Sequence, residues 1–201
     1  VLLKPASWSP LVALELARIA EAAGLPKGLL SVLPGAGSIV GEMLVTHPAI
    51  GRVSFTGGTS VGRGIARKAA EKLMPVSLEL GGKSPTIVFA DADLDVALAG
   101  VLFGIFSSTG QSCIAGSRLY VERPIYESFV ARLVAATKAL VVGHPFDAAT
   151  QVAPLVHDDH RASVEAFVAS GVADGGEILA GGARPAGDLY DRGVYYLPTI
   201  V

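Results

Sequence analysis

The sequence predicts an α/β fold made of two lobes, each with a parallel sheet that helices cover. Short apolar strand patterns alternate with amphipathic helix patterns along the chain, and the pair Gly81 and Gly82 separates two such series. This alternation is typical of a mostly parallel sheet with helices on both faces. We therefore expect one lobe over residues 1–81 and a second over residues 82–201, with the glycine pair as the hinge.

In the first lobe, the expected elements alternate strictly between strands and helices. Ser9 is the expected cap of the first helix, Pro10 its first residue and Gly24 its end. This order is that of a nucleotide-binding domain of the Rossmann type. The expected strands are residues 1–3, 29–33, 52–55 and 76–80, and the expected helices are residues 10–23, 38–46 and 59–73.

In the second lobe, the same alternation begins again after the glycine pair. The apolar run at residues 96–106 contains two glycines and predicts a buried helix that leads into a loop. Both ends of the chain fall within strand patterns, so we expect both lobes to be incomplete parts of a larger fold. The expected strands are residues 86–89, 119–121 and one near Tyr195, and the expected helices are residues 94–106, 125–141 and 159–170.

Composition and charge exclude several classes of function. The chain has 201 residues, a hydrophobic content of 51% and a mean hydropathy of +0.52, which is enough for one or two packed cores. Its 16 basic and 18 acidic residues are spread without long runs, so no nucleic-acid partner is expected. No secretion signal is visible, and no apolar stretch reaches the about 20 residues of a membrane span. A single cysteine excludes an internal disulfide and favours a reducing compartment, so we expect the cytoplasm.

The single cysteine, Cys113, ends the run Gly-Gln-Ser-Cys at residues 110–113. A thiolate in a polar loop is a nucleophile for carbonyl carbon, and the preceding serines, threonine and glycine predict such a loop. Upstream, Glu79 lies at the end of a strand pattern, where burial would make its carboxylate a usable base near neutral pH. The alternatives are a small buried cysteine, which is the commoner role of isolated cysteines, and a structural ion pair for Glu79.

Five stretches of the sequence, taken together, resemble the aldehyde dehydrogenase superfamily. Residues 78–85 and residues 110–113 are similar to its two signature stretches, and the separation of 34 residues between Glu79 and Cys113 also fits. The resemblance extends over nearly all of this chain but over less than half of a typical member. The three further stretches, in the family's order, are residues 4–6, 55–62 and 144–155.

The resemblance implies an oxidoreductase that converts a small-molecule aldehyde to a carboxylic acid with NAD or NADP. Cys113 would add to the carbonyl to give a thiohemiacetal and then a thioester, and Glu79 would activate the water that hydrolyses it. The backbone N–H of Cys113 would donate to the oxyanion. In the family, an asparagine before this region and a glutamate after it complete the site, so the 201 residues alone are expected to be inactive. Full-length members are usually homo-dimers or homo-tetramers.

Residues of the first lobe would bind the cofactor, which makes residues 1–81 part of an NAD(P)-binding domain and residues 82–201 part of a catalytic domain. Gly57, Gly58 and Gly62 lie where a strand meets a helix. There, glycine allows close approach and helix amides favour a pyrophosphate, although a tight turn is the alternative. The run is neither a G-x-G-x-x-G fingerprint nor a Walker loop. By the resemblance, the remaining cofactor-binding residues are Lys4 at the adenosine ribose, Ser7 and Leu80.

Two positions depart from the family pattern. Members that prefer NAD commonly have a glutamate at the position of Ser7, whose carboxylate binds the ribose hydroxyl and repels a 2′-phosphate. Ser7 removes that repulsion, so either NAD or NADP is expected as cofactor. Gly58 replaces a serine of many members, so one phosphate contact would come from backbone amides alone.

Two other functions compete with this interpretation. A relative that passes the thioester to coenzyme A usually lacks the hydrolytic glutamate, so Glu79 argues against it. A non-catalytic binding or structural relative would not require both Cys113 and Glu79. His157 and His160 have a spacing that suits a metal on one helix face, but a helix start with an aspartate cap explains them better, and no metal is expected.

Overall fold

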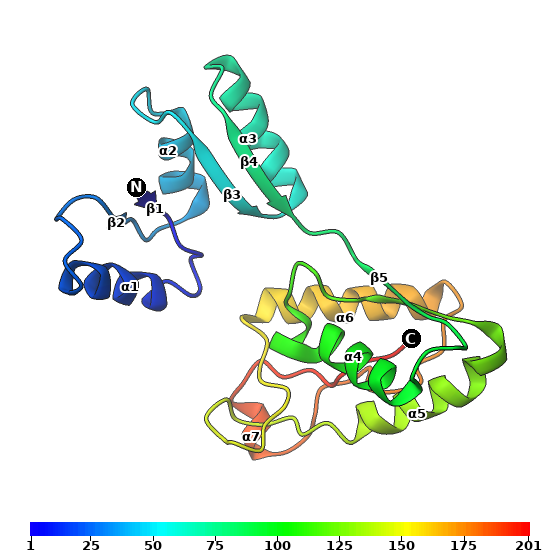
Figure 1. The fold of residues 1–201 in the computed structure, drawn as a ribbon. Helices are drawn as coiled ribbons and strands as arrows, with labels where there is room; N and C mark the ends of the chain where they lie inside the picture. Colours follow the sequence, from blue (N-terminus) through cyan, green and yellow to red (C-terminus); the bar gives the residue numbers. More distant parts are fainter. The chain divides into compact units, whose positions relative to one another are not determined.

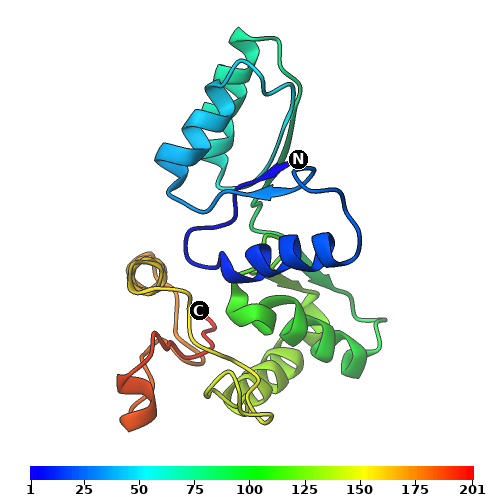
Figure 2. The ribbon, with the colours of Figure 1, turned by 90° about the vertical axis from the view of Figure 1, so that its left-hand side faces the viewer.

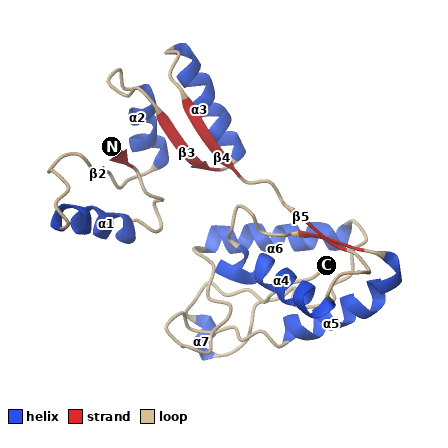
Figure 3. Ribbon diagram, in the orientation of Figure 1, coloured by secondary structure: helices blue, strands red, loops and turns tan.

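The computed structural model describes residues 1–201 as two compact units, Val1–Gly81 (unit 1) and Gly82–Val201 (unit 2) (Figure 1). Helices make up most of the regular structure, and the short strands are joined in pairs (Figure 3). Every strand pair is parallel, which confirms the predicted α/β class. No helix is both long enough and apolar enough to cross a membrane.

Unit 1 contains two separate parallel strand pairs rather than one continuous sheet. Its elements are β1 (Leu2–Leu3), α1 (Leu11–Ala22), β2 (Ser31–Val32), η1 (Gly37–Gly41), α2 (Glu42–Thr46), β3 (Val53–Gly57), α3 (Thr59–Glu71) and β4 (Val76–Leu80). The first pair joins β1 to β2 over two residues. The second joins β3 to β4 over five residues, from Val53 opposite Val76 to Gly57 opposite Leu80.

The core of unit 1 is a small cluster in which α2 and α3 pack on one side of the β3–β4 pair (Figure 2). Val45 of α2, Ala69 of α3 and Met74 are buried at its centre. α1 buries none of its residues, and apolar side chains such as Leu11 and Val12 are exposed. The partly buried side chains around the centre are Ile50, Val53, Ile65 and Val76.

Several boundaries in unit 1 differ from the prediction. Ser9 is not the cap of α1, because the first helical hydrogen bond is accepted by the Pro10 carbonyl and places Pro10 at the cap. Gly24, with φ +95°, follows the end of α1 as expected. β2 is shorter than predicted, since the Leu29 N–H donates to the Pro26 carbonyl and keeps that stretch in a turn. A π-helix, η1, also precedes α2 where a single helix is predicted.

Unit 2 is built around one buried cluster at which β5, α4 and α5 meet. Its elements are β5 (Pro85–Val88), α4 (Leu94–Phe106), η2 (Ser107–Gly110), β6 (Arg118–Val121), η3 (Arg123–Ile125), α5 (Tyr126–Lys138), α6 (Asp158–Ala173) and α7 (Asp188–Asp191). β5 pairs with β6 in parallel over four residues. Phe129 of α5 has 0% exposure and packs with Val88, Val101 and Leu133, so it forms the centre of this core.

Three predictions for unit 2 need correction. No strand forms near Tyr195: the side chain is buried, but the surrounding segment makes no ladder, and the nearest bridge is an isolated one between Ala180 and Ile200. α4 has the predicted bounds but is not buried as a whole, because Val96 is exposed although Val101 is in the core. α6 is capped by a histidine rather than an aspartate.

Candidate active site

The structure places the candidate nucleophile in unit 2 and the candidate base and cofactor-binding residues in unit 1. Within unit 1 it brings together two groups of residues. Lys4 and Ser7 meet at one carbonyl, and the glycines of the β3–α3 junction meet Leu80.

Cys113 is exposed and lies in a turn that follows η2. The residues before it have an unusual backbone, because Ser108 (φ 51°), Thr109 (φ 57°) and Gly110 (φ 70°) are three consecutive left-handed residues. Non-glycine residues adopt this conformation at a cost of about 1–2 kcal/mol each, so other contacts must hold the turn. The prediction of a polar loop before Cys113 is therefore confirmed, and the loop has a defined shape.

Ser112 closes the turn around Cys113 from both its backbone and its side chain. The Ser112 carbonyl accepts from the Ala115 N–H at 3.2 Å, and the Ser112 hydroxyl accepts from the Ile114 N–H at 3.4 Å. Ala115 is buried, whereas Ile114 is exposed like Cys113. The Cys113 thiol is therefore exposed on a turn whose last residue, Ala115, is buried.

We call residues 108–115 the cysteine turn. Two of its side chains tie it to a distant segment, residues 153–156, which we call the anchor segment. The Thr109 hydroxyl donates to the Ala153 carbonyl at 3.1 Å. The Gln111 Oε1 accepts from the Val156 N–H at 3.1 Å, and the Gln111 Nε2 donates to the Ser108 carbonyl at 3.4 Å. The sequence alone does not indicate these contacts, because they join segments 44 and 45 residues apart.

The anchor segment is itself fixed within unit 2. Leu155 is buried, and its N–H donates to the Val194 carbonyl at 2.8 Å. Just before the segment, Val152 is buried and forms a parallel bridge with Val142. The turn that carries Cys113 is therefore held by a part of the chain that has its own packing and backbone hydrogen bonds.

Glu79 lies near the end of β4, opposite Thr56 of β3. Its side chain is exposed, while the neighbouring Leu78 and Leu80 are partly buried, because successive strand residues point to opposite faces. The burial predicted for Glu79 is therefore not provided by unit 1. No ion pair forms at Glu79, so the structural alternative has no partner in this unit.

The junction between β3 and α3 has the properties of an anion site. Gly58 caps α3, and no side chain caps the first turn of this helix. A Cβ on Gly58 would meet no atom within 4 Å, so space is open beside the free N–H groups. At Gly62 a Cβ would lie 2.7 Å from Cδ2 of Leu80, so the absence of a side chain allows α3 to approach β4 closely. The carboxyl end of the strand pair thus holds Gly57, Gly58, Gly62 and Leu80 together.

Lys4 and Ser7 follow β1 and converge on the Gly35 carbonyl, which follows β2. The Lys4 Nζ donates to this carbonyl at 3.1 Å and also to the Pro5 carbonyl. The Ser7 Oγ donates to it at 3.3 Å. Both predicted ribose-side residues are therefore neighbours at the carboxyl end of the β1–β2 pair, and each has a hydrogen-bond donor there.

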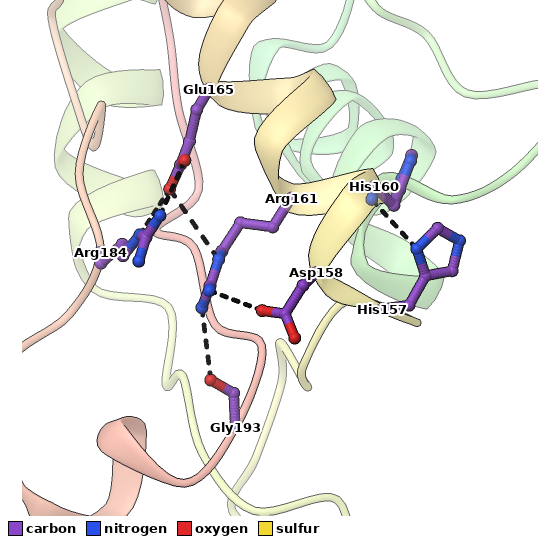
Figure 4. A network of polar contacts seen from close by, with 7 residues as sticks. All are labelled: His157, Asp158, His160, Arg161, Glu165, Arg184 and Gly193. Atoms are coloured by element: carbon purple, nitrogen blue, oxygen red, sulfur yellow. Dashed lines mark hydrogen bonds and ion pairs between the residues drawn. The ribbon is translucent and has the colours of Figure 1, made fainter.

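A second polar cluster links α6 to the segment that follows it (Figure 4). Arg161 lies at its centre: Nη2 contacts Oδ1 of Asp158 at 2.7 Å, and Nη1 donates to the Gly193 carbonyl at 3.4 Å. The Arg184 guanidinium binds Glu165 through two hydrogen bonds, at 2.6 and 2.9 Å, and holds the pKa of that carboxyl below its usual range. This network ties the last part of the chain to α6.

His157 and His160 lie on the other side of the α6 start (Figure 4). The Nδ1 of His157 accepts from the His160 N–H at 3.1 Å and caps the helix. Partial burial lowers the pKa of His160, and His157 and Lys83 lower it further by their charge. No group of three or more histidine, cysteine or acidic side chains is arranged to hold a metal ion.

A cavity of about 420 Å³ lies beside the Arg161 network. Its charged lining includes Asp158, Arg161 and Arg184, which are already paired with carboxylates or guanidinium groups of the network. Cys113 does not line this cavity. The cavity is therefore separate from the cysteine turn.

The parallel strand pairs and the helices that cover them define an α/β protein, and comparison with known proteins narrows this class to one family. The sequence profile of the aldehyde dehydrogenase family matches residues 1–201. The chain therefore belongs to the aldehyde dehydrogenase family, as the resemblance in its sequence predicts.

Similar proteins of known sequence carry two different substrate names. A betaine aldehyde dehydrogenase of Rhizobium etli (strain CIAT 652) is 45% identical over 197 residues, which cover 98% of this chain and 40% of the relative. A 3,6-anhydro-alpha-L-galactose dehydrogenase of Streptomyces coelicolor is 43% identical over 201 residues, which cover 100% of this chain and 41% of the relative. The chain thus spans about 40% of the length of the relatives it matches.

Solved structures show the same fold. HpcC from Thermus thermophilus superposes with a TM-score of 0.95 at 46% identity, over 99% of this chain and 39% of that chain. A betaine aldehyde dehydrogenase from Staphylococcus aureus, in complex with NAD+ and with a BME-modified cysteine, gives a TM-score of 0.94 at 37% identity, over 98% of this chain and 40% of that chain. These likenesses confirm the α/β fold assigned above.

Proposed function

We propose that the full-length protein oxidises an aldehyde to a carboxylic acid with NAD or NADP, through a covalent intermediate on Cys113. The observation that carries this proposal is the exposed cysteine on a turn that Ser112 closes by accepting two hydrogen bonds, in a chain that belongs to the aldehyde dehydrogenase family. In this proposal unit 1 is part of the NAD(P)-binding domain and unit 2 is part of the catalytic domain.

Cys113 supplies the nucleophile. Its thiolate adds to the carbonyl carbon, so an S–C bond forms and the carbonyl electron pair moves to oxygen. The backbone N–H of Cys113 donates to that oxygen and stabilises the negative charge. Loss of a hydride from the same carbon converts the thiohemiacetal to a thioester.

The dinucleotide cofactor, when bound, supplies the acceptor for the hydride. Gly58 and the uncapped first turn of α3 fit a pyrophosphate, because the N–H groups are free and the space beside Gly58 is open. Lys4 and Ser7 would bind the adenosine ribose, and Leu80 would line the same end of unit 1. Because Ser7 carries no charge, it does not repel a 2′-phosphate, and we propose that NADP is accepted as well as NAD.

Glu79 completes the reaction as a general base. It takes a proton from water, the hydroxyl adds to the thioester carbon, and the C–S bond breaks to release the carboxylic acid and the Cys113 thiolate. No ion pair within unit 1 occupies the Glu79 carboxylate, which leaves it available for this role. A relative that passes the thioester to coenzyme A would not need this residue.

The substrate class is a small aldehyde. Relatives that are 43–45% identical are named for betaine aldehyde and for 3,6-anhydro-alpha-L-galactose, so both compounds belong in the first substrate panel. We further propose a cytoplasmic homo-dimer or homo-tetramer; size-exclusion chromatography with light scattering tests the oligomeric state.

The direct test is steady-state kinetics of the full-length protein with each aldehyde and with NAD or NADP. Cys113→Ser should lower kcat on the order of 1,000-fold or more. Glu79→Gln should lower steady-state kcat about 100-fold and leave the first turnover as a burst of reduced cofactor. Formation of acyl-CoA when coenzyme A is added, with no dependence on Glu79, would instead identify an acylating enzyme. Cofactor binding without turnover of any aldehyde would indicate a binding module.

A further inference from the structure

We infer that Gln111, together with Thr109, is a positioning residue that fixes the turn of Cys113 against the anchor segment. This role rests on the proposed function of Cys113 as nucleophile. Its basis is that both side chains leave the turn and bind backbone groups 44 and 45 residues further along the chain. These two hydrogen bonds join the cysteine turn to a distant part of unit 2.

Gln111 uses both ends of its amide group. Its Oε1 accepts from the Val156 N–H at 3.1 Å, while its Nε2 donates to the Ser108 carbonyl at 3.4 Å. The backbone N–H of Gln111 also donates to the Ser108 carbonyl, at 3.0 Å. One side chain therefore connects the start of the turn to the anchor segment, two residues before the thiol.

The backbone of the turn explains why such a connection is needed. Ser108 and Thr109 are both left-handed, and two adjacent non-glycine residues in this region relax unless neighbouring contacts hold them. The Thr109 hydroxyl holds one of them directly, through its bond to the Ala153 carbonyl at 3.1 Å. Without these two side chains the turn would adopt other conformations, and Cys113 would move with it.

The anchor segment is firm enough to serve as a reference point. Leu155 donates to the Val194 carbonyl, and the adjacent Gly193 carbonyl accepts from Arg161 in the network of Figure 4. Misplacing a nucleophile by about 1 Å costs about 100-fold in rate. Loss of the Gln111 connection should therefore lower kcat between about 10-fold and 100-fold and leave the KM for cofactor within about twofold, because the cofactor residues lie in unit 1.

The experiment compares Gln111→Met with Gln151→Met in the full-length protein. Gln151 is a matched control, because its Oε1 also accepts from a backbone N–H, that of Val141, at 3.0 Å, but it does not contact the cysteine turn. We expect Gln111→Met to lower kcat at least about 10-fold, and Gln151→Met to keep it within about threefold. The rate at which iodoacetamide alkylates Cys113 should stay within about threefold of the wild-type rate in both variants, because the thiol remains exposed.

A second pair keeps the test decisive if Gln111→Met does not fold. Thr109→Ala removes the hydroxyl that binds Ala153, and Thr109→Ser keeps it. Lower kcat in Thr109→Ala with recovery in Thr109→Ser supports positioning, and equal kcat in the two variants overturns it. Equal losses in Gln111→Met and Gln151→Met, or less than about a twofold loss in Gln111→Met, also overturn it.

Hydrogen exchange separates this inference from the proposed function. If the wild-type protein oxidises none of the aldehydes, the proposed function fails, but the fixing of the turn is still measurable. Faster amide exchange in residues 107–114 and at Val156 of Gln111→Met than of wild type would support it. Unchanged exchange in both places would overturn it.

Discussion

The two units hold their candidate site residues in different ways. In unit 2, Cys113 follows a strained backbone stretch that side chains tie to a segment 44 and 45 residues away, and the core of this unit contains the fully buried Phe129. In unit 1, Lys4 and Ser7 meet at the Gly35 carbonyl, and Glu79 is exposed on a short strand pair over a small cluster. The candidate nucleophile is thus fixed by long-range contacts, whereas the candidate base and cofactor residues depend on strand ends and glycines.

This difference suits the chemistry proposed for each unit. A nucleophile must hold a defined position relative to the carbonyl carbon, so a rigid support increases the rate of the chemical step. Cofactor binding relies on backbone N–H groups and open space at a helix start, which need few supporting side chains. Changes in unit 2 should therefore lower stability more than matched changes in unit 1.

The largest expected effect is in the core of unit 2. Phe129→Ala should lower the free energy of unfolding by about 3–5 kcal/mol, because it removes a ring with 0% exposure from the centre of the cluster. Phe146→Ala is the control, since that side chain is 93% exposed, and it should change stability by less than about 0.5 kcal/mol. Urea denaturation of the full-length protein measures the free energy of unfolding of both variants. Equal losses would show that the cluster around Phe129 is not the main source of stability of unit 2.

A smaller effect is expected from two arginines in matched ion pairs. Arg161 and Arg18 each bind an acidic residue three positions earlier, but the Arg161 side chain is 15% exposed and the Arg18 side chain 71%. Arg161→Met should lower stability by about 1–2 kcal/mol, because it also frees the Gly193 carbonyl. Arg18→Met should cost about 0.5 kcal/mol or less. Thermal denaturation measures the stability of both variants. A similar loss of stability in Arg161→Met and Arg18→Met would show that the two ion pairs contribute equally in the two units.

The smallest expected effect is the pH dependence that His160 of unit 2 contributes to stability. The pKa of His160 in the folded state is below its ordinary value of 6.5, so the folded state favours the neutral ring. Its contribution to stability is complete above pH 6.5 and is lost as pH falls through the lower, folded-state pKa. The free energy of unfolding, measured by denaturation, should therefore decrease between about pH 7.5 and pH 5. This decrease should be smaller in the His160→Gln variant. A pH dependence that His160→Gln leaves unchanged would contradict this assignment.

Local signals in the sequence predicted much of the fold. The apolar run after Asp93 gave the bounds of α4, and β4 was predicted residue for residue. The predicted strand near Tyr195 was wrong, because aromatic residues marked burial and not strand pairing. The cap of α6 was also misassigned, since His157 can accept the same backbone bond that aspartate usually accepts.

The candidate site was predictable only in part, because local signals indicate residue types and not the contacts between distant segments. Short motifs identify Cys113 and the glycines of the β3–α3 junction, because their residue types are unusual at those places. The bonds from Thr109 and Gln111 to residues 153–156 join segments far apart in the chain, and no local pattern or periodicity indicates them. The exposure of Glu79 depends on which face of β4 the unit covers, which requires the three-dimensional packing.

The most direct measurement of the proposed chemistry is mass spectrometry of the covalent intermediate. The Glu79→Gln variant of the full-length protein is mixed with cofactor and the best aldehyde of the panel, quenched in acid and digested. We predict an acyl adduct on the peptide that contains Cys113, dependent on cofactor and absent from the double variant with Cys113→Ser. Aldehyde oxidation that continues in Cys113→Ser, with no adduct on the Cys113 peptide of Glu79→Gln, would contradict the covalent role of this cysteine.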